Sequence, residues 1–136
     1  EGIAEYIAKI KKEVRARGYV ETLFGRRRYL PEIYSSAEYI RKEAERMAVN
    51  APIQGTAADI AKLGMIRSQA FIKKNFKGEA FQLLQIHDEL LFEVKKEKVK
   101  DFVPEVGKIL EEIYKGDITL TAEAKVGDNW TELKKL

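Results

Sequence analysis

The sequence predicts an α+β fold, because helical and strand-like patterns occupy different stretches of one 136-residue chain. Over residues 3–14, apolar side chains recur every three or four positions, which is typical of a helix with one buried face. Two β-prone runs, 81–86 and 90–94, are separated by three polar residues, which is typical of a hairpin. Because no repeat or linker interrupts the chain, we expect a single unit over residues 1–136.

A short hairpin is predicted directly after Gly18, the residue expected to end the first helix. Residues 19–24 and 29–30 are β-prone, and the segment 25–28 between them begins with glycine, as turns often do. We therefore expect the tip of this hairpin to carry three consecutive arginines, Arg26, Arg27 and Arg28.

Two separate helices are predicted next. The first covers about residues 37–50, where the serine pair before it can cap its start. Pro52 is expected to end it, because proline cannot continue the helical hydrogen-bond ladder. The second covers about 54–76 and again has apolar residues at helical spacing.

The end of the chain is predicted to contain one more helix, over about 96–114, and a final strand, over about 118–126. Pro104 within the helix indicates a kink or a delayed start. Within the single unit, residues 1–76 form a mainly helical part with the arginine-rich hairpin. Residues 77–136 form the second hairpin, its helix and the final strand.

The composition excludes several kinds of site. With no cysteine, the chain has no disulfide scaffold, thiolate zinc site, iron–sulfur cluster or cysteine nucleophile. A single histidine excludes most multi-histidine metal sites. No serine lies in a G-x-S-x-G context, and the glycines are scattered rather than gathered in a phosphate-binding loop.

The termini and hydropathy carry no targeting signal. No stretch approaches the ~20 apolar residues that span a bilayer, and the N-terminus lacks the pattern of a signal peptide. We therefore expect a cytoplasmic protein with no membrane partner. Because the chain begins with Glu1 and not with methionine, we also expect it to be processed or excised from a longer polypeptide.

Arginine is distributed unevenly along the chain. All eight arginines lie in the first 67 residues, and the basic residues after that point are all lysines. Since the guanidinium fork matches phosphate and base-edge acceptors, this bias indicates a nucleic-acid or phosphate surface. A highly charged surface of the thermophilic kind explains the same bias, so both interpretations stay open.

His87, Asp88 and Glu89 separate the two runs of the second hairpin. A solvated turn is the simplest explanation for them. However, tight hairpins favour Asn-Gly or Asp-Gly, and none of these three residues is glycine. A carboxylate at the end of a rigid hairpin also suits Mg²⁺, which takes hard oxygen ligands and often needs only one or two protein carboxylates.

Arg46, Asn50 and Gln54 form a second constellation, with a spacing of four residues. Each also fits an ordinary role on a helix surface or at a helix end. As hydrogen-bond donors, all three can reach the minor-groove acceptors that every base pair presents, so they can hold a duplex without reading its sequence.

Four segments occur in order along the chain: 19–29 (YVETLFGRRRY), 45–59 (ERMAVNAPIQGTAAD), 84–89 (LQIHDE) and 126–130 (VGDNW). Together they resemble the C-terminal part of family A DNA polymerases, the bacterial DNA polymerase I family. The similarity runs from about Tyr6 to Trp130, nearly the whole chain.

The resemblance implies a portion of the polymerase palm with adjoining fingers elements, in which an antiparallel hairpin carries a metal-binding aspartate and packs on helices. Asp88 matches the family's third-motif carboxylate, one of two aspartates that hold a catalytic Mg²⁺ pair. By the same resemblance, Glu89 supports the metal site or the primer end. His87 is expected to contact the primer terminus.

The same resemblance assigns Arg46, Asn50 and Gln54 to the minor groove of the primer–template DNA near the newest base pair, and Gln85 is expected to join them. From the arginine bias, we also expect the first hairpin to contact DNA through Arg26, Arg27 and Arg28.

The resemblance also implies missing parts. The motif with the other metal-binding aspartate and the fingers helix that binds the incoming dNTP lie upstream in the family. We therefore expect a portion that is inactive alone, exposes apolar surface, and needs an upstream polymerase segment for template-directed synthesis in replication or repair. Two alternatives stay open: a non-catalytic duplex-DNA-binding module, and a structural α+β domain with a solvated charged surface.

Overall fold

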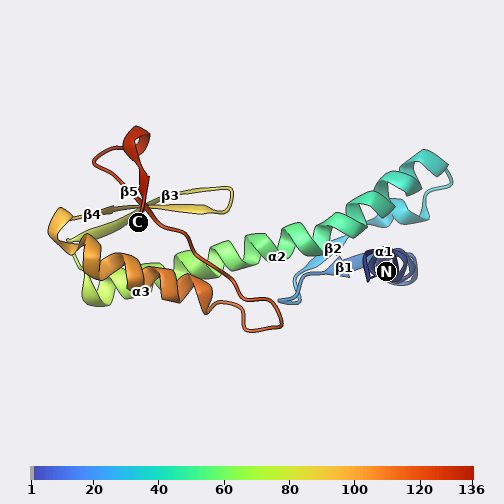
Figure 1. Ribbon diagram of the computed structural model, residues 1–136. Helices are drawn as coiled ribbons and strands as arrows, with labels where there is room; N and C mark the ends of the chain where they lie inside the picture. Colours follow the sequence, from blue (N-terminus) through green and yellow to red (C-terminus); the bar gives the residue numbers. More distant parts are fainter. Residues whose placement is uncertain (1) are drawn as a thin grey trace. The chain divides into compact units, whose positions relative to one another are not determined.

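The computed structural model describes residues 2–136 (Figure 1). The chain divides into two compact units between Asp59 and Ile60, inside its longest helix. This boundary lies within an element and not between residues 76 and 77, where the sequence patterns change. Within residues 2–136, the helices are too short or too polar to cross a membrane.

The first unit contains one helix, a small hairpin and the first part of a long helix: α1 (Gly2–Arg17), β1 (Tyr19–Glu21), β2 (Arg27–Tyr29), the 3-10 helix η1 (Pro31–Tyr34) and α2 (Glu38–Asn75). Gly18 ends α1 as predicted, with a φ of +74° that glycine adopts without strain. A Cβ atom there would also lie 3.2 Å from the ring of Tyr34.

The first strand of the first hairpin is shorter than predicted, and the second strand begins two residues earlier. In the antiparallel register, Tyr19 pairs with Tyr29, and Val20 pairs with Arg28. The chain leaves β1 after Glu21, so Arg27 and Arg28 lie in β2, and only Arg26 belongs to the turn. A triple-arginine tip is therefore not what forms. Arg26 and Arg28 face α2, and Arg27 lies on the opposite face of the hairpin, as described below.

The core of the first unit joins α1, the hairpin and α2 through eight buried residues: Ile10, Val14, Val20, Leu30, Ile33, Ala44, Ala48 and Ala51. At its edge, the nearly buried carboxylate of Glu45 accepts hydrogen bonds from Arg15 and lies 3.1 Å from the ammonium group of Lys11. The hydrogen bonds from Arg15 hold the pKa of Glu45 below its ordinary value. Tyr6 adds a bond of 3.1 Å to the carbonyl of Val49.

The prediction that Pro52 ends a helix is wrong. α2 runs without interruption through Pro52, so the two predicted helices are one. Proline removes one hydrogen bond from the ladder, but tertiary packing can offset that loss. On the preceding turn, the small buried Ala48 and Ala51 pack closely into the core and support the helix through this point.

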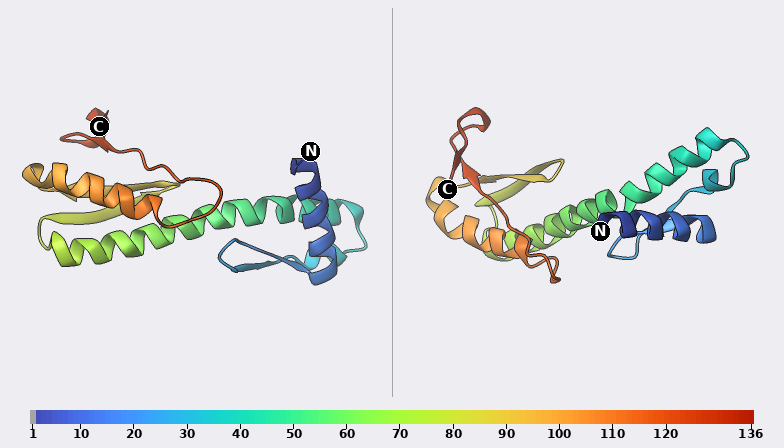
Figure 2. Two further views of the ribbon diagram at one scale, coloured as in Figure 1. Left: turned by 60° about the horizontal axis from the view of Figure 1, so that its bottom comes forward. Right: turned by 45° about the vertical axis from the view of Figure 1, so that its right-hand side comes forward.

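The second unit contains the rest of α2, β3 (Ala80–Ile86), β4 (Glu89–Val94), the 3-10 helix η2 (Lys96–Lys98) and α3 (Val99–Glu111). Figure 2 shows that α3 runs alongside the C-terminal part of α2. The β3–β4 hairpin lies next to both helices. Phe102 of α3 lies at the centre of the core, with ring centroids 5.4 Å from those of Phe76 and Phe92. α3 begins at Val99, three residues later than predicted, and continues through Pro104, so this proline lies inside the helix and does not mark its start.

The predicted final strand over residues 118–126 is mostly wrong. Only Lys125–Val126 (β5) is a strand, and it pairs with Lys134–Lys135 (β6). The residues before β5 have an alternating pattern but no neighbouring strand to pair with in the described chain. An alternating pattern forms a strand only where a neighbouring strand can pair with its backbone N–H and C=O groups. The pattern by itself does not show whether such a neighbour exists.

Candidate nucleic-acid interface and hairpin carboxylates

Four side chains that the sequence marked as DNA contacts line one hollow of about 380 Å³ in the first unit. One comes from β2 and three come from α2. The three side chains from α2 lie on one helix face because α2 is continuous. Residues three, four or seven positions apart therefore stay aligned. The full set of lining residues is Arg28, Glu43, Arg46, Met47, Asn50 and Gln54.

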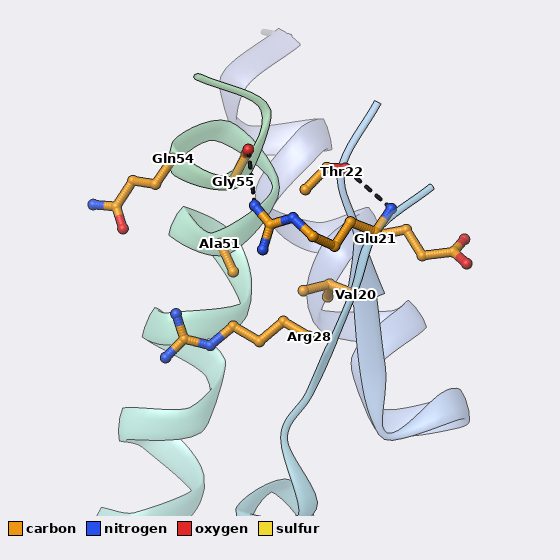
Figure 3. Close-up of a pocket in the computed structure, with 8 residues that line it drawn as sticks. Val20, Glu21, Thr22, Arg28, Ala51, Gln54 and Gly55 are labelled. Carbon is orange, nitrogen blue, oxygen red and sulfur yellow. Dashed lines mark hydrogen bonds between the residues drawn. The ribbon is translucent and has the colours of Figure 1, made fainter. Parts of the chain in front are cut away.

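Arg28 reaches this surface because it faces α2 from the hairpin. It pairs with Val20 across the strands, so both side chains lie on the face of the hairpin that packs toward the core. Figure 3 shows the Arg28 side chain extending from the hairpin toward the helix that carries Ala51 and Gln54. A smaller hollow of about 150 Å³ adjoins it and shares Arg28 and Gln54 with the larger one.

Arg26 is engaged with α2. Its Nε donates to Oδ1 of Asp59 at 2.7 Å, and its Nη2 donates to the carbonyl of Gly55 at 3.0 Å. A Cβ at Gly55 would lie 2.6 Å from Cγ2 of Thr22, so glycine is what lets the hairpin approach the helix this closely. Arg26 thus positions the hairpin beside the turn that carries Gln54. DNA contact by Arg26 stays a prediction.

Arg27 lies on the opposite face of the hairpin from Arg28. Its Nε donates to Glu21 at 2.7 Å, and that bond raises the pKa of Arg27. Its guanidinium carbon lies 4.7 Å from the centroid of the Tyr19 ring, and this ring in turn lies 5.4 Å from that of Tyr29. These contacts stabilise the hairpin. The side chain is half-exposed, so DNA contact by Arg27 also stays a prediction.

The carboxylates of the second unit lie at the end of the β3–β4 hairpin. Ile86 pairs with Glu89, which leaves a turn of only two residues, His87 and Asp88. His87 is the one described non-glycine residue with a positive φ, at 53°. Such a conformation is uncommon outside glycine, although asparagine, aspartate and histidine adopt it more often than other residues, and it often accompanies a functional site. All three polar residues of the segment are exposed.

Gln85 contributes to the same turn. Its Nε2 donates to the carbonyl of His87 at 3.1 Å, and its side chain shares a hairpin face with that of Leu90. The bond reaches the first residue of the turn and supports its backbone. DNA contact by Gln85 stays a prediction.

The turn carboxylates meet part of what a Mg²⁺ site requires. Asp88 and Glu89 are adjacent and exposed, and they offer the hard oxygen ligands that Mg²⁺ prefers. Within residues 2–136, however, no group of three or more histidine, cysteine or acidic residues gathers in a way that could hold a metal ion. The two carboxylates therefore fit Mg²⁺ as a portion of a ligand set.

Two lining residues, Glu43 and Met47, were not predicted as site residues. Glu43 lies on the same helix face as Arg46 and Asn50, at three and seven residues from them. This spacing is present in the sequence, but the pattern that predicted the site is one of hydrogen-bond donors, and a carboxylate is an acceptor. Its neighbour Met47 carried no signal of its own.

Comparison with known proteins identifies the chain. The model of DNA polymerase family A matches residues 1–132. The chain belongs to DNA polymerase family A. The family A chain is 43% identical over 133 residues to the thermostable DNA polymerase I of Thermus filiformis and 41% identical over 131 residues to DNA polymerase I of Pseudomonas aeruginosa. These alignments cover 98% and 96% of the chain, but only 16% and 14% of those relatives.

A solved structure agrees with this assignment. The family A chain superposes with a TM-score of 0.81 on the POL domain of Pol1 from M. smegmatis, which was solved in complex with DNA primer-template and dNTP. The identity is 43%, and the match covers 86% of this chain and 20% of the other. The α+β class and the family resemblance are confirmed. The chain spans less than a fifth of the length of its curated relatives.

Proposed function

We propose that this chain is the C-terminal portion of a family A polymerase domain and serves template-directed DNA synthesis, the transfer of a nucleotide from dNTP to a primer 3′-hydroxyl. The observation that carries the proposal is the convergence of Arg28, Arg46, Asn50 and Gln54 on one hollow, in a chain of this family. This is a site of hydrogen-bond donors, and DNA is rich in acceptors.

The first unit would hold the primer–template duplex. Arg46, Asn50 and Gln54 follow one helix face, so they can donate to successive minor-groove acceptors, adenine N3 and thymine O2, that every orientation of the pair presents. Arg28 lies across the hollow on the hairpin and is suited to a phosphate oxygen. Such a face binds a paired duplex whatever its sequence, which is what a replication or repair polymerase requires.

The second unit would hold the reacting end. The two-residue turn projects Asp88 from a rigid hairpin, and Glu89 and His87 flank it. In this role, Asp88 and Glu89 bind metal, Glu89 also supports the primer end, and His87 positions the primer terminus. Bound Mg²⁺ supplies the positive charge that activates the 3′-hydroxyl and stabilises the phosphoryl transfer.

We further propose that an upstream polymerase segment completes the site. Two carboxylates do not make a two-ion site, and the described residues contain no third ligand beside them. Three apolar residues of β3 are also close to half exposed, which indicates a surface meant to be covered: Phe81 (51%), Leu83 (48%) and Leu84 (49%). The chain alone is therefore expected to be inactive.

A duplex-binding module without chemistry is the second candidate. It is favoured by one observation: all the donors of the hollow come from the first unit, whereas the carboxylates of the second unit have no third ligand among residues 2–136. Both candidates bind duplex DNA, and they differ in turnover.

The test is Mg²⁺-dependent extension of a labelled primer–template by the chain, with and without an added upstream polymerase segment. We expect extension only with the added segment, and its loss by at least about a hundredfold in Asp88→Ala, because a missing metal ligand removes several kcal/mol of charge stabilisation. Asp117→Ala, an exposed aspartate outside the turn, is the control and should extend normally.

Duplex affinity, measured in parallel, should be nearly unchanged in Asp88→Ala. Extension by the purified chain alone would contradict the dependence on an upstream segment. Duplex binding without extension in any combination would favour the binding module.

A further inference from the structure

One acidic residue lies among the donors of the larger hollow, which is the proposed duplex-binding site. Of the six residues that line it, only Glu43 carries a negative charge. A carboxylate in a cationic surface repels DNA phosphates and competes for the same donors. Its presence there needs an explanation that the proposed function does not supply.

Glu43 is paired with Arg46, one helix turn away. A carboxylate oxygen of Glu43 lies 2.8 Å from Nη2 of Arg46, which is hydrogen-bonded to it. The Arg46 and Glu43 side chains are 73% and 51% exposed. A pair this exposed is weak, so it forms readily and is readily displaced.

The pair and the duplex compete for one guanidinium. While Nη2 of Arg46 donates to Glu43, the side chain is drawn back along α2 toward the preceding turn. The N–H of Nη2 that donates to Glu43 becomes free for a base edge only when this bond breaks. The other two donors on the same helix face, Asn50 and Gln54, have no such acidic neighbour among the residues of the hollow.

We propose that Glu43 is an intramolecular competitor that holds Arg46 when no duplex is bound and thereby lowers duplex affinity. The inference rests on the proposed duplex-binding role of the hollow. The functional consequence is faster duplex release, because Glu43 can bind the Arg46 guanidinium as soon as Arg46 dissociates from the duplex. A polymerase must loosen its hold on the duplex at every step along the template.

The experiment measures binding of a short blunt-ended, fluorescently labelled duplex by anisotropy at low salt. Glu43→Gln removes the charge and keeps the shape, and it should tighten binding about two- to fivefold. Glu38→Gln is the matched control. Glu38 forms an ion pair of 2.8 Å with Lys42 on the same helix, but it does not line the hollow. It should leave the affinity unchanged.

A second background tests whether Glu43 acts through Arg46. In Arg46→Gln, the further change Glu43→Gln should bring no gain, because the competed donor is gone. An equal gain in this background, or an equal gain from Glu38→Gln, would show a general charge effect and overturn the inference. Thermal unfolding of each variant checks that the helix is intact.

The remaining outcomes separate the two proposals. If the unmodified chain binds the duplex and Glu43→Gln does not change the affinity, the inference fails and the proposed function stands. If the unmodified chain and all variants fail to bind the duplex, the duplex-binding role of this chain fails, and the inference fails with it.

Discussion

At the scale of single residues, the turn of the second hairpin is the least ordinary feature of the chain. A two-residue turn of this kind favours asparagine or glycine, yet it is occupied by His87 at a φ of 53° and by Asp88. The conformation costs about 1–2 kcal/mol for a side chain with a Cβ. Histidine adopts such a φ more readily than most residues with a Cβ, which limits this cost.

The first prediction concerns this position. His87→Asn should preserve the free energy of unfolding, because asparagine tolerates a positive φ. His87→Val should lower it by about 1–2 kcal/mol, because a β-branched side chain does not. Chemical denaturation of the two variants measures the difference. Equal stabilities would mean that the turn does not hold His87 in this conformation.

At the scale of elements, the junction between the first hairpin and α2 decides where the donors of the hollow lie. Arg26 bonds to Asp59 and to the carbonyl of Gly55, directly beside Gln54. These contacts set the approach of β2, and with it the place of Arg28. Arg26, Arg27 and Arg28 therefore make different contacts. The sequence could not distinguish them, because three consecutive arginines have the same chemistry.

The second prediction tests this close approach. Gly55→Ala places a Cβ 2.6 Å from Cγ2 of Thr22, so the hairpin must shift, and stability should fall by about 1–3 kcal/mol. Thr22→Ser removes Cγ2 and keeps the hydroxyl that accepts from the Arg26 amide. The double variant should recover most of the loss in thermal unfolding. Failure of this rescue would locate the strain elsewhere.

At the scale of the whole molecule, residues 2–136 form two buried clusters, one in each unit, and α2 contributes to both. The first cluster is bordered by Glu45, whose carboxylate binds Arg15 and Lys11 of α1. The second is centred on aromatic residues. Charge therefore contributes to the stability of the first unit in a way that depends on pH.

The third prediction gives the sign of that dependence. Since the folded state lowers the pKa of Glu45, the ionised carboxylate stabilises the fold above its ordinary pKa of about 4.3, and this contribution is lost as pH falls through the lowered value. Glu45→Gln should thus cost about 1–2 kcal/mol at pH 7 and progressively less in acid. Unfolding curves from pH 7 to pH 3 test it, with the exposed Glu97→Gln as control. A constant difference would contradict the prediction.

Much of the fold could be predicted because it is local. Helix α1, both hairpins and the stop at Gly18 follow from spacing and turn chemistry within a few residues of each other. The errors at Pro52 and over 118–124 have one cause: each depends on what lies across from the segment. Packing carries α2 through a proline, and the lack of a neighbour leaves an alternating run without a strand.

The sequence by itself determined the family, the α+β class, and the donors Arg46, Asn50 and Gln54, because motif order and residue chemistry do not depend on geometry. Only the tertiary structure decided which donors share a hollow. It placed Arg28 there, engaged Arg26 with α2, turned Arg27 to the opposite face, and set Glu43 among the donors. The physical reason lies in the two periodicities. Successive residues of a strand lie on opposite faces, and a helix places residues three or four positions apart on one face, so sequence neighbours are separated and more distant residues are brought together.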